Sequence, residues 1–328
     1  MSTQPRTKTD PWDTIVVGGG VAGLSAALLV ARSRRRVLVI DSGAPRNRFA
    51  AHMHGVLGND GKPPLDFVQQ GRKELASYGV EFLSGSAIDV TEIASLAGTV
   101  GESDAGIEVK LASGHSFRAR TLIVASGVKD TLPAVPGLAE RWGKSVFHCP
   151  FCDGWEVAEQ RIGVLATSPV SLHQVEMLRQ WSNQVNFLAF GAGPLDEAAL
   201  HRLRARGIAV IDSKVNAVLG QEPAISAVRT DDGQEIEIDA IFTMGTLTPH
   251  DGFLAGLDLE REDLPFGLGS FLQVDATGKT SHPRIWAVGN VVNPMTNVPQ
   301  SIGAGATTGP AVAGFLIQED YARITAQQ

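Results

Sequence analysis

Short apolar runs alternate with glycine turns and helix-like segments in the first part of the chain. The order is an apolar run at 14–18, a glycine turn at 18–23, an apolar helix pattern at 24–32 and a second apolar run at 37–40. Continuous apolar runs of this length, separated by a helix, are typical of parallel strands that are covered on both faces. The pattern predicts a strand–turn–helix–strand unit.

The same alternation returns later in the chain. Further strands are expected at 80–84, 121–127, 161–165, 185–190, 208–211, 241–245 and 285–290, an antiparallel region at 87–118, a hairpin around 231–233, and helices at 66–78, 166–181 and 301–318. The second strand–turn–helix unit lies inside the span of the first. We therefore predict an α/β protein of two nested, Rossmann-like, three-layer domains.

The predicted boundaries divide the chain into a tail and two domains. Residues 1–12 are expected to be a disordered tail, 13–128 and 247–328 to form the outer domain, and 129–246 to form the inserted domain.

Composition and charge exclude several classes of protein. The chain has 328 residues, of which 43% are hydrophobic and 19% charged, so we expect a packed globular protein. Its net charge of −7 argues against a nucleic-acid partner. It has no apolar run of about 18 residues and no secretory signal at its start, which predicts a cytoplasmic protein without a membrane partner.

The first glycine turn matches a dinucleotide-binding fingerprint in its proper context. Gly18 allows the tight turn, Gly20 lets the backbone approach a pyrophosphate, and Gly23 allows close packing of helix on strand. Asp41 ends the second strand, where a carboxylate accepts from ribose hydroxyls.

Cys149 and Cys152 are the only cysteines, and they form one C-x-x-C. This spacing lets the sulfurs reach disulfide geometry, and a helix N-terminus lowers the pKa of a thiol. A zinc site needs about four ligands, and no second C-x-x-C exists, so we expect no metal. The alternative is a purely structural disulfide. It is less favoured, because closing so small a loop removes little entropy from the unfolded state and therefore adds little stability. The redox interpretation is preferred.

Residues 45–64 have no regular period and contain many turn formers. Long irregular stretches inside compact proteins are usually functional. His52 and His54 lie in this stretch, and two lone histidines are more often residues of a loop or of a cofactor wall than metal ligands.

Together these motifs resemble the low-molecular-weight thioredoxin reductases, class II of the FAD-dependent pyridine nucleotide-disulfide oxidoreductase superfamily. The glycine turn with Asp41, the small-residue turn at 125–127, the Cys-x-x-Cys-Asp-Gly segment and the late turn at 287–290 carry the resemblance. It implies a homodimeric FAD enzyme whose FAD domain contains an inserted, smaller nicotinamide-type domain bearing the cysteine pair.

The resemblance also implies roles for individual residues. The ADP part of FAD would be held by Gly18, Gly20, Gly23 and Asp41, the flavin nucleotide by Ala125, Ser126 and Gly127, and the ribityl chain and ring by Gly289, Asn290 and Gln300. Cys152 would lie nearer the flavin, Cys149 would attack the substrate disulfide, and Asp153 would be the acid and base. Asn290 stands where the family usually has Asp, and its amide keeps an acceptor oxygen.

The inserted domain departs from the family pattern. Ala166 and Ser168 occupy the places of the first two glycines of the nucleotide turn, and Pro169 removes an N–H donor. The following strand ends without Lys or Arg and is followed by Asp196 and Glu197, which would repel a 2′-phosphate. The stretch at 46–61 resembles relatives that oxidise dithiol natural products. The segment at 149–156 resembles both that group and deep-branching cyanobacterial reductase-like proteins, and with these departures the cyanobacterial proteins with a degenerate NADPH site are the expected nearest group.

The expected function is a thioredoxin reductase-like disulfide oxidoreductase. Electrons would pass from FAD through Cys149 and Cys152 to a protein disulfide such as that of thioredoxin, from a donor other than NADPH, with ferredoxin as one candidate. The alternatives are a dithiol oxidase that uses oxygen, an NADPH-dependent thioredoxin reductase with an altered nucleotide site, and a flavin-binding redox sensor.

Overall fold

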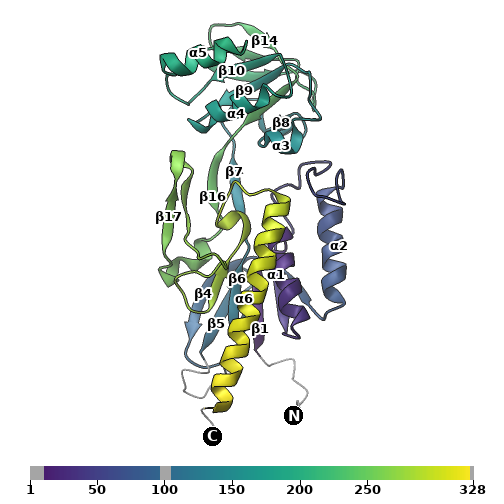
Figure 1. The fold of residues 1–328 in the computed structure, drawn as a ribbon, viewed down its shortest axis with the longest axis vertical. Helices are drawn as coiled ribbons and strands as arrows, with labels where there is room; N and C mark the ends of the chain where they lie inside the picture. The colour runs from purple at the N-terminus through teal and green to yellow at the C-terminus, as the bar shows by residue number, and fades with distance from the viewer. Residues whose placement is uncertain (1–10, 97–104, 326–328) are drawn as a thin grey trace.

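The chain folds into two lobes joined by a narrow connection (Figure 1). The computed structural model describes residues 11–96 and 105–325. Most of the predicted tail, residues 1–10, lies outside this part. Trp12, which the sequence assigned to the tail, instead begins the first strand; its ring is buried under the Arg36 guanidinium, 4.1 Å from the ring centroid.

The outer lobe is built on a seven-stranded sheet. The order is β3-β2-β1-β6-β5-β4, and β19 pairs with β6. The strands are β1 (Trp12–Val17), β2 (Val37–Asp41), β3 (Glu81–Ser84), β4 (Ala87–Ile93), β5 (Gly106–Leu111), β6 (Ser116–Val124) and β19 (Ile285–Ala287). β1, β2, β3, β6 and β19 run parallel, whereas β4 and β5 are antiparallel. The predicted α/β class is confirmed.

The helices that the described residues form in this lobe are α1 (Val21–Arg32), α2 (Pro64–Ala76) and α6 (Val298–Thr325). Figure 1 shows α6 running along the length of the lobe beside α1. The two helices approach closely because α6 presents Gly305 and Gly309 to α1: a Cβ on Gly305 would lie 2.3 Å from the Ala22 carbonyl oxygen. The sequence analysis predicted a helix only over residues 301–318. The last turns of α6 lack an apolar pattern, because they are polar and are held by ion pairs.

The second lobe, called the inner lobe, corresponds to the predicted inserted domain. It has a parallel sheet in the order β11-β10-β9-β15-β8. Its strands are β8 (Val146–Phe147), β9 (Ile162–Ala166), β10 (Val185–Ala189), β11 (Ala209–Ile211) and β15 (Ala240–Thr243). An antiparallel sheet of β12 (Val215–Leu219), β13 (Ala227–Thr230) and β14 (Glu235–Glu237) accompanies it. Its helices are α3 (Pro150–Asp153), α4 (Val170–Leu178) and α5 (Glu197–Ala205). The helix predicted at 166–181 begins later, at Val170, because residues 167–169 form the turn that precedes it.

The chain crosses between the lobes twice, through β7 (Val128–Thr131) and β16 (Thr246–Pro249), which pair with each other. The predicted domain boundaries, 128/129 and 246/247, fall at these strands. The remaining elements are β17 (Arg261–Leu264), β18 (Gly269–Leu272), and the 3₁₀ turns η2 (Ala139–Arg141), η3 (Gly252–Leu257), η4 (Pro265–Gly267) and η5 (Gly289–Val291).

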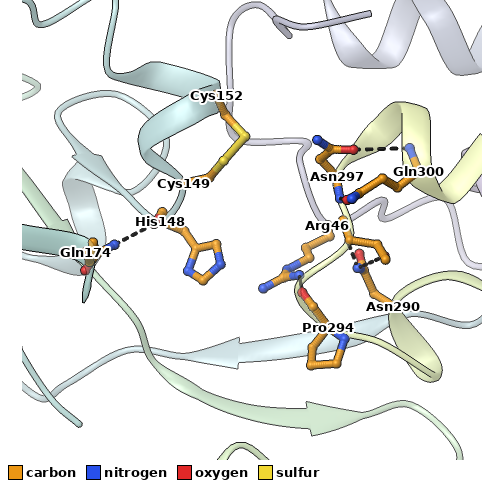
Figure 2. Close-up of a disulfide and its surroundings, with 10 residues drawn as sticks. Arg46, His148, Cys149, Cys152, Gln174, Asn290, Pro294, Asn297 and Gln300 are labelled. Atoms are coloured by element: carbon orange, nitrogen blue, oxygen red, sulfur yellow. Dashed lines mark hydrogen bonds between the residues drawn. A yellow bond between two sulfur atoms is a disulfide. The ribbon is translucent and has the colours of Figure 1, made fainter. Parts of the chain in front are cut away.

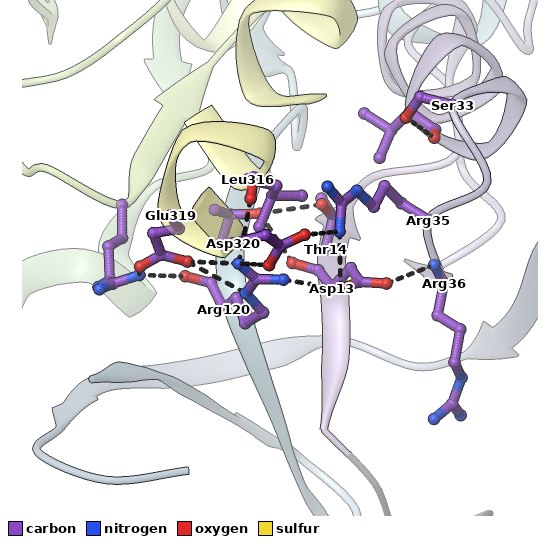
Figure 3. A network of polar contacts seen from close by, with 12 residues as sticks. Asp13, Thr14, Ser33, Arg35, Arg36, Arg120, Leu316, Glu319 and Asp320 are labelled. Atoms are coloured by element: carbon purple, nitrogen blue, oxygen red, sulfur yellow. Dashed lines mark hydrogen bonds and ion pairs between the residues drawn. The ribbon is translucent and has the colours of Figure 1, made fainter. Parts of the chain in front are cut away.

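A buried ion network ties the first strand to the last helix (Figure 3). The Arg120 guanidinium, on β6, donates to Asp13 Oδ1 at 3.2 Å, to Glu319 Oε2 at 2.7 Å and to the Leu316 carbonyl oxygen at 3.2 Å. Arg120 and Asp13 are only 5% and 1% exposed. Because each buried charge is compensated by the others, removing one partner leaves the rest unpaired.

We therefore predict that Arg120→Ala lowers the free energy of unfolding by roughly 3–5 kcal/mol. Arg118→Ala is the matched control: Arg118 lies on the same strand, and its bond to Glu108 is exposed, so about 0–1 kcal/mol should be lost. Urea unfolding of the two variants measures both values. Equal losses would contradict the assignment of the network as the attachment of α6.

Candidate functional site

The ends of four parallel strands meet at one edge of the outer sheet. Val17 is in register with Ile40 of β2 and with Val124 of β6, and Val124 is in register with Ala287 of β19. The turns that follow these strands therefore lie side by side. This is where ligands bind in open α/β sheets.

The three glycines of the first turn have different surroundings. Gly18 has φ +109°, and a Cβ on it would lie 2.2 Å from the Ala125 carbonyl oxygen. A Cβ on Gly23 would lie 2.0 Å from the Gly18 carbonyl oxygen, so this glycine sets the helix–strand distance. Gly20 differs, because nothing lies within 4 Å of its added Cβ, and the open space faces a cavity. The backbone approach expected at Gly20 has room for a ligand.

Asp41 lies at the cavity wall with its carboxylate held in place. Its Oδ1 accepts from the Gly19 N–H at 3.0 Å, and its Oδ2 lies 3.4 Å from Arg72 Nη2. A carboxylate has about four lone-pair sites, so further hydrogen bonds from hydroxyl groups can be accepted.

The turn after β6 supplies Ala125, Ser126 and Gly127 to the same wall. The Ser126 hydroxyl is buried and has no hydrogen-bond partner in the described part of the chain. A buried hydroxyl without a partner is costly, which fits a site that is completed by a polar ligand.

The segment from β19 to α6 contributes the other predicted residues. Gly289 (φ +79°) packs against Ala22, 2.8 Å from an added Cβ. Asn290 donates its amide to the Asn293 and Thr296 carbonyl oxygens, which leaves its carbonyl oxygen as the acceptor that the sequence expected. Gln300 lines the cavity and caps the start of α6 together with Asn297. The Gln300 N–H donates to Asn297 Oδ1 at 3.1 Å, and Gln300 Oε1 accepts from the Asn297 N–H at 3.0 Å.

All these turns face one cavity of about 1710 Å³ that also reaches the cysteine pair. Most of the predicted cofactor residues line it; Gly23 and Gly289 stand behind the wall as packing residues. Cavity volume, the open cradle at Gly20 and the unpartnered Ser126 hydroxyl all fit an extended dinucleotide such as FAD.

Cys149 and Cys152 form a disulfide at the start of α3, with their Cα atoms 5.2 Å apart. Cys149 is the N-cap of this short helix, and Pro150 follows in its first turn. Figure 2 shows the disulfide on the inner lobe, opposite Arg46, Asn290 and Gln300 of the outer lobe. The two predicted halves of the site therefore face each other across the cavity.

Asp153 follows the pair and lines the same cavity. Loss of hydration on burial, and then the negative charge of Glu156, raise the pKa of its carboxyl to about 6, while His54 acts in the opposite direction. A carboxyl that titrates near neutrality can both give and accept a proton at working pH.

Several site residues were not predicted. Arg46 makes a bidentate ion pair with Asp130 at 2.6 and 2.7 Å, which joins the irregular 45–64 stretch to the connecting strand β7. Gln174 of α4 donates to the His148 carbonyl oxygen at 2.6 Å and so holds the backbone just before Cys149. Burial, and then the charge of Arg46, lower the pKa of His148 to about 4, so its ring is neutral at pH 7. Only the adjacency of His148 to the pair was visible in the sequence.

In the turn between β9 and α4, Thr167 is bonded within the inner lobe, whereas the buried Ser168 hydroxyl has no hydrogen-bond partner among the described residues. The Thr167 N–H donates to Ser171 Oγ at 3.2 Å, and the Thr167 hydroxyl donates to the Met244 carbonyl oxygen at 2.7 Å. The loop after β10 folds back, and the Gly191 N–H donates to the Ala166 carbonyl oxygen at 2.7 Å. Asp196 caps α5 by accepting from the Ala199 N–H at 2.6 Å.

The fold and the site define a flavin-dependent disulfide oxidoreductase. The sequence model of the pyridine nucleotide-disulphide oxidoreductases matches residues 12–309, and the chain belongs to this family. Its members are FAD-binding flavoproteins, so the expected cofactor and the expected enzyme class, an oxidoreductase similar to thioredoxin reductases, are confirmed.

Individual relatives agree with this assignment. The thioredoxin reductase tcpT of Claviceps purpurea (strain 20.1) is 29% identical over 321 residues, 94% of this chain and 95% of its own. The crystal structure of HlmI superposes with a TM-score of 0.90 at 37% identity, covering 99% of this chain and 98% of that one. The crystal structure of an oxidoreductase from Agrobacterium tumefaciens superposes with a TM-score of 0.84 at 34% identity, covering 94% of this chain and 99% of that one. The closeness to cyanobacterial proteins stays a prediction.

The described residues were searched for metal-ligand clusters and for membrane-spanning helices. Among residues 11–96 and 105–325, no three His, Cys, Asp or Glu side chains are grouped as metal ligands. No helix in that part of the chain has the length and apolarity needed to cross a bilayer.

Gly20→Val tests the cofactor cradle. The side chain enters open space, so the protein should fold, but it fills the volume that a pyrophosphate would occupy. We expect the purified variant to lose its yellow colour. Gly314→Val on α6, also in open space, is the control and should keep full flavin absorbance. A fully yellow Gly20→Val protein would refute the cradle.

Asp153→Asn tests the raised pKa. The folded-state pKa of about 6 exceeds the unfolded value, so ionising Asp153 costs stability. The cost is absent below about pH 4, grows between pH 4 and 6, and is complete above pH 6. Asp153→Asn should therefore be about 2–3 kcal/mol more stable than wild type at pH 7.5 and equally stable near pH 4. Urea unfolding of both proteins at both pH values measures the two free energies of unfolding. If their difference does not vary with pH, the raised pKa of Asp153 is contradicted.

Proposed function

We propose that the protein passes two electrons between FAD and a substrate disulfide through Cys149 and Cys152, with a protein disulfide such as that of thioredoxin as substrate and a donor other than NADPH. The observation that carries the proposal is the single cavity shared by the dinucleotide turns and the cysteine pair. FAD, when bound there, supplies reversible two-electron chemistry.

The cysteines and Asp153 perform the exchange with the substrate. In the reduced pair, the Cys149 thiolate attacks one substrate sulfur, the substrate S–S bond breaks, and a Cys149–substrate disulfide forms. The departing sulfur takes a proton from Asp153. The Cys152 thiolate then attacks Cys149 Sγ, which restores the Cys149–Cys152 disulfide and releases the second substrate thiolate. The two electrons of the dithiol end on the substrate.

The loss of free backbone N–H groups in the turn between β9 and α4 supports a donor other than NADPH. A nucleotide pyrophosphate needs free backbone N–H groups at a helix start. Here the Thr167 N–H is already bonded to Ser171, and Pro169 has none. The acceptors Asp196 and Glu197 lie beyond β10 in place of cations for a 2′-phosphate.

A dithiol oxidase is the second candidate, and the same loss of N–H groups favours it. A dithiol substrate brings its own electrons and needs no nicotinamide site. The exchange then runs in reverse, from substrate dithiol to the Cys149–Cys152 disulfide, with oxygen as the final acceptor.

The likeness to thioredoxin reductases supports a homodimer, and the sequence pattern at the start of the chain supports a cytoplasmic location; both belong to this proposal.

Anaerobic mixing of the holoenzyme with NADPH or NADH tests the donor. We expect the flavin absorbance to persist, and dithionite-reduced enzyme to reduce thioredoxin; Cys152→Ser should stay yellow but lose this transfer. Fast bleaching by NADPH would overturn the donor assignment. Failure with thioredoxin, combined with hydrogen peroxide formation from dithiols in air, would establish the oxidase instead.

A further inference from the structure

The Asp41 carboxylate has a different neighbour on each of its oxygens. Oδ1 accepts from the Gly19 N–H at 3.0 Å, on the side of the glycine turn, and Oδ2 lies 3.4 Å from Nη2 of Arg72, on the side of α2. The carboxylate approaches the turn so closely that a Cβ on Gly19 would lie 2.8 Å from the Asp41 carboxyl carbon. The Asp41 side chain is only 12% exposed, so water cannot fully replace a lost partner. Rotation of the carboxylate is therefore restricted.

An aromatic ring holds the Arg72 guanidinium in this place. Its Cζ lies 5.0 Å from the centroid of the Phe82 ring, on β3, and stacking on an aromatic face is typical of guanidinium groups. Within the described part of the chain, Asp41 is the carboxylate at ion-pair distance from Arg72, and Arg72 Nε is buried without a hydrogen-bond partner. Asp41 is therefore the polar group that the Arg72 side chain serves.

The position of Asp41 decides which part of the cofactor depends on this pair. Asp41 ends β2 and lines the cavity, and a carboxylate at the end of this strand in a dinucleotide fold accepts from the hydroxyls of the adenosine ribose. A side chain that is already immobilised loses little rotamer freedom when a ligand binds, so its preorganisation raises affinity. Arg72 itself is not among the residues that line the cavity.

We propose that Arg72 is a positioning residue for the adenosine half of FAD: stacked on Phe82, it holds the Asp41 carboxylate in the orientation that accepts from the ribose. The inference concerns the cofactor end of the cavity. It does not depend on the electron donor or on the substrate proposed above, and either can fail without affecting it.

The test compares the two halves of the cofactor. Release of FAD from the diluted holoenzyme is followed by the rise of flavin fluorescence, and ADP and FMN are titrated separately into the flavin-depleted full-length protein. We expect Arg72→Gln to release FAD roughly 3- to 10-fold faster and to weaken ADP binding by a similar factor, because Asp41 must then be ordered on binding. The affinity for FMN should not change, since FMN lacks the adenosine.

Arg32→Gln is the matched control. It also removes a guanidinium from an aromatic ring of the outer lobe, that of Tyr78, and should leave all three measurements unchanged. Unchanged FAD release in Arg72→Gln would overturn the proposal. Equal weakening of ADP and FMN would also overturn it, because both carry phosphate and a general effect of charge would weaken both.

A double-mutant cycle separates positioning from direct contact with the cofactor. In an Asp41→Ala background, adding Arg72→Gln should have no further effect on FAD release, because the group that Arg72 positions is absent. An effect of full size in that background would overturn the proposal in favour of direct contact. If the Asp41→Ala protein retains no FAD, the ratio of ADP to FMN affinity in Arg72→Gln decides by itself.

Discussion

The parallel register of β2, β1, β6 and β19 is the constraint on which the site depends. It places four strand ends at one edge, and each following turn then contributes backbone or a short side chain to one cavity. Glycine at positions 18 and 23 is needed for this convergence, since a Cβ at either would meet a carbonyl oxygen at about 2 Å. Gly20 differs from these two glycines, because an added Cβ there would have no atom within 4 Å and would face the cavity. Packing therefore requires glycine at positions 18 and 23 but does not explain it at position 20.

The inner lobe repeats the strand–turn–helix unit with different residues in its turn. β9 and β10 pair in the same parallel way as β1 and β2, so the scaffold for a nucleotide is present. Two hydrogen bonds engage the backbone of this turn, from the Thr167 N–H to Ser171 Oγ and from the Gly191 N–H to the Ala166 carbonyl oxygen. Helix α4 also contacts the segment before the cysteine pair, because the Gln174 side chain donates to the His148 carbonyl oxygen. A fold shared by two lobes does not give them a shared function.

Local patterns predicted most of the fold, and they failed where distant segments meet. Periodicity located the strands and helices because each depends on residues close in sequence. The end of α6 was missed because its last turns are held by Arg120, about 200 residues away in the chain. The glycine turn, Asp41 and the cysteine pair were visible because their chemistry depends on short spacings. The roles of Arg46 and Gln174 and the contact between His54 and Glu156 were not, since each depends on segments far apart in sequence.

The contacts between the lobes near the site differ greatly in strength. The Arg46–Asp130 pair is bidentate and Asp130 is 7% exposed, so breaking it would leave a poorly hydrated charge. It joins the outer lobe to β7, which is part of the connection itself. The His54–Glu156 contact is open to solvent, with Glu156 39% exposed, and pairs of this kind contribute about 0–1 kcal/mol. The contact through β7 is therefore strong, whereas the His54–Glu156 contact costs little to open. Opening the weaker contact leaves the attachment of the lobes through β7 intact.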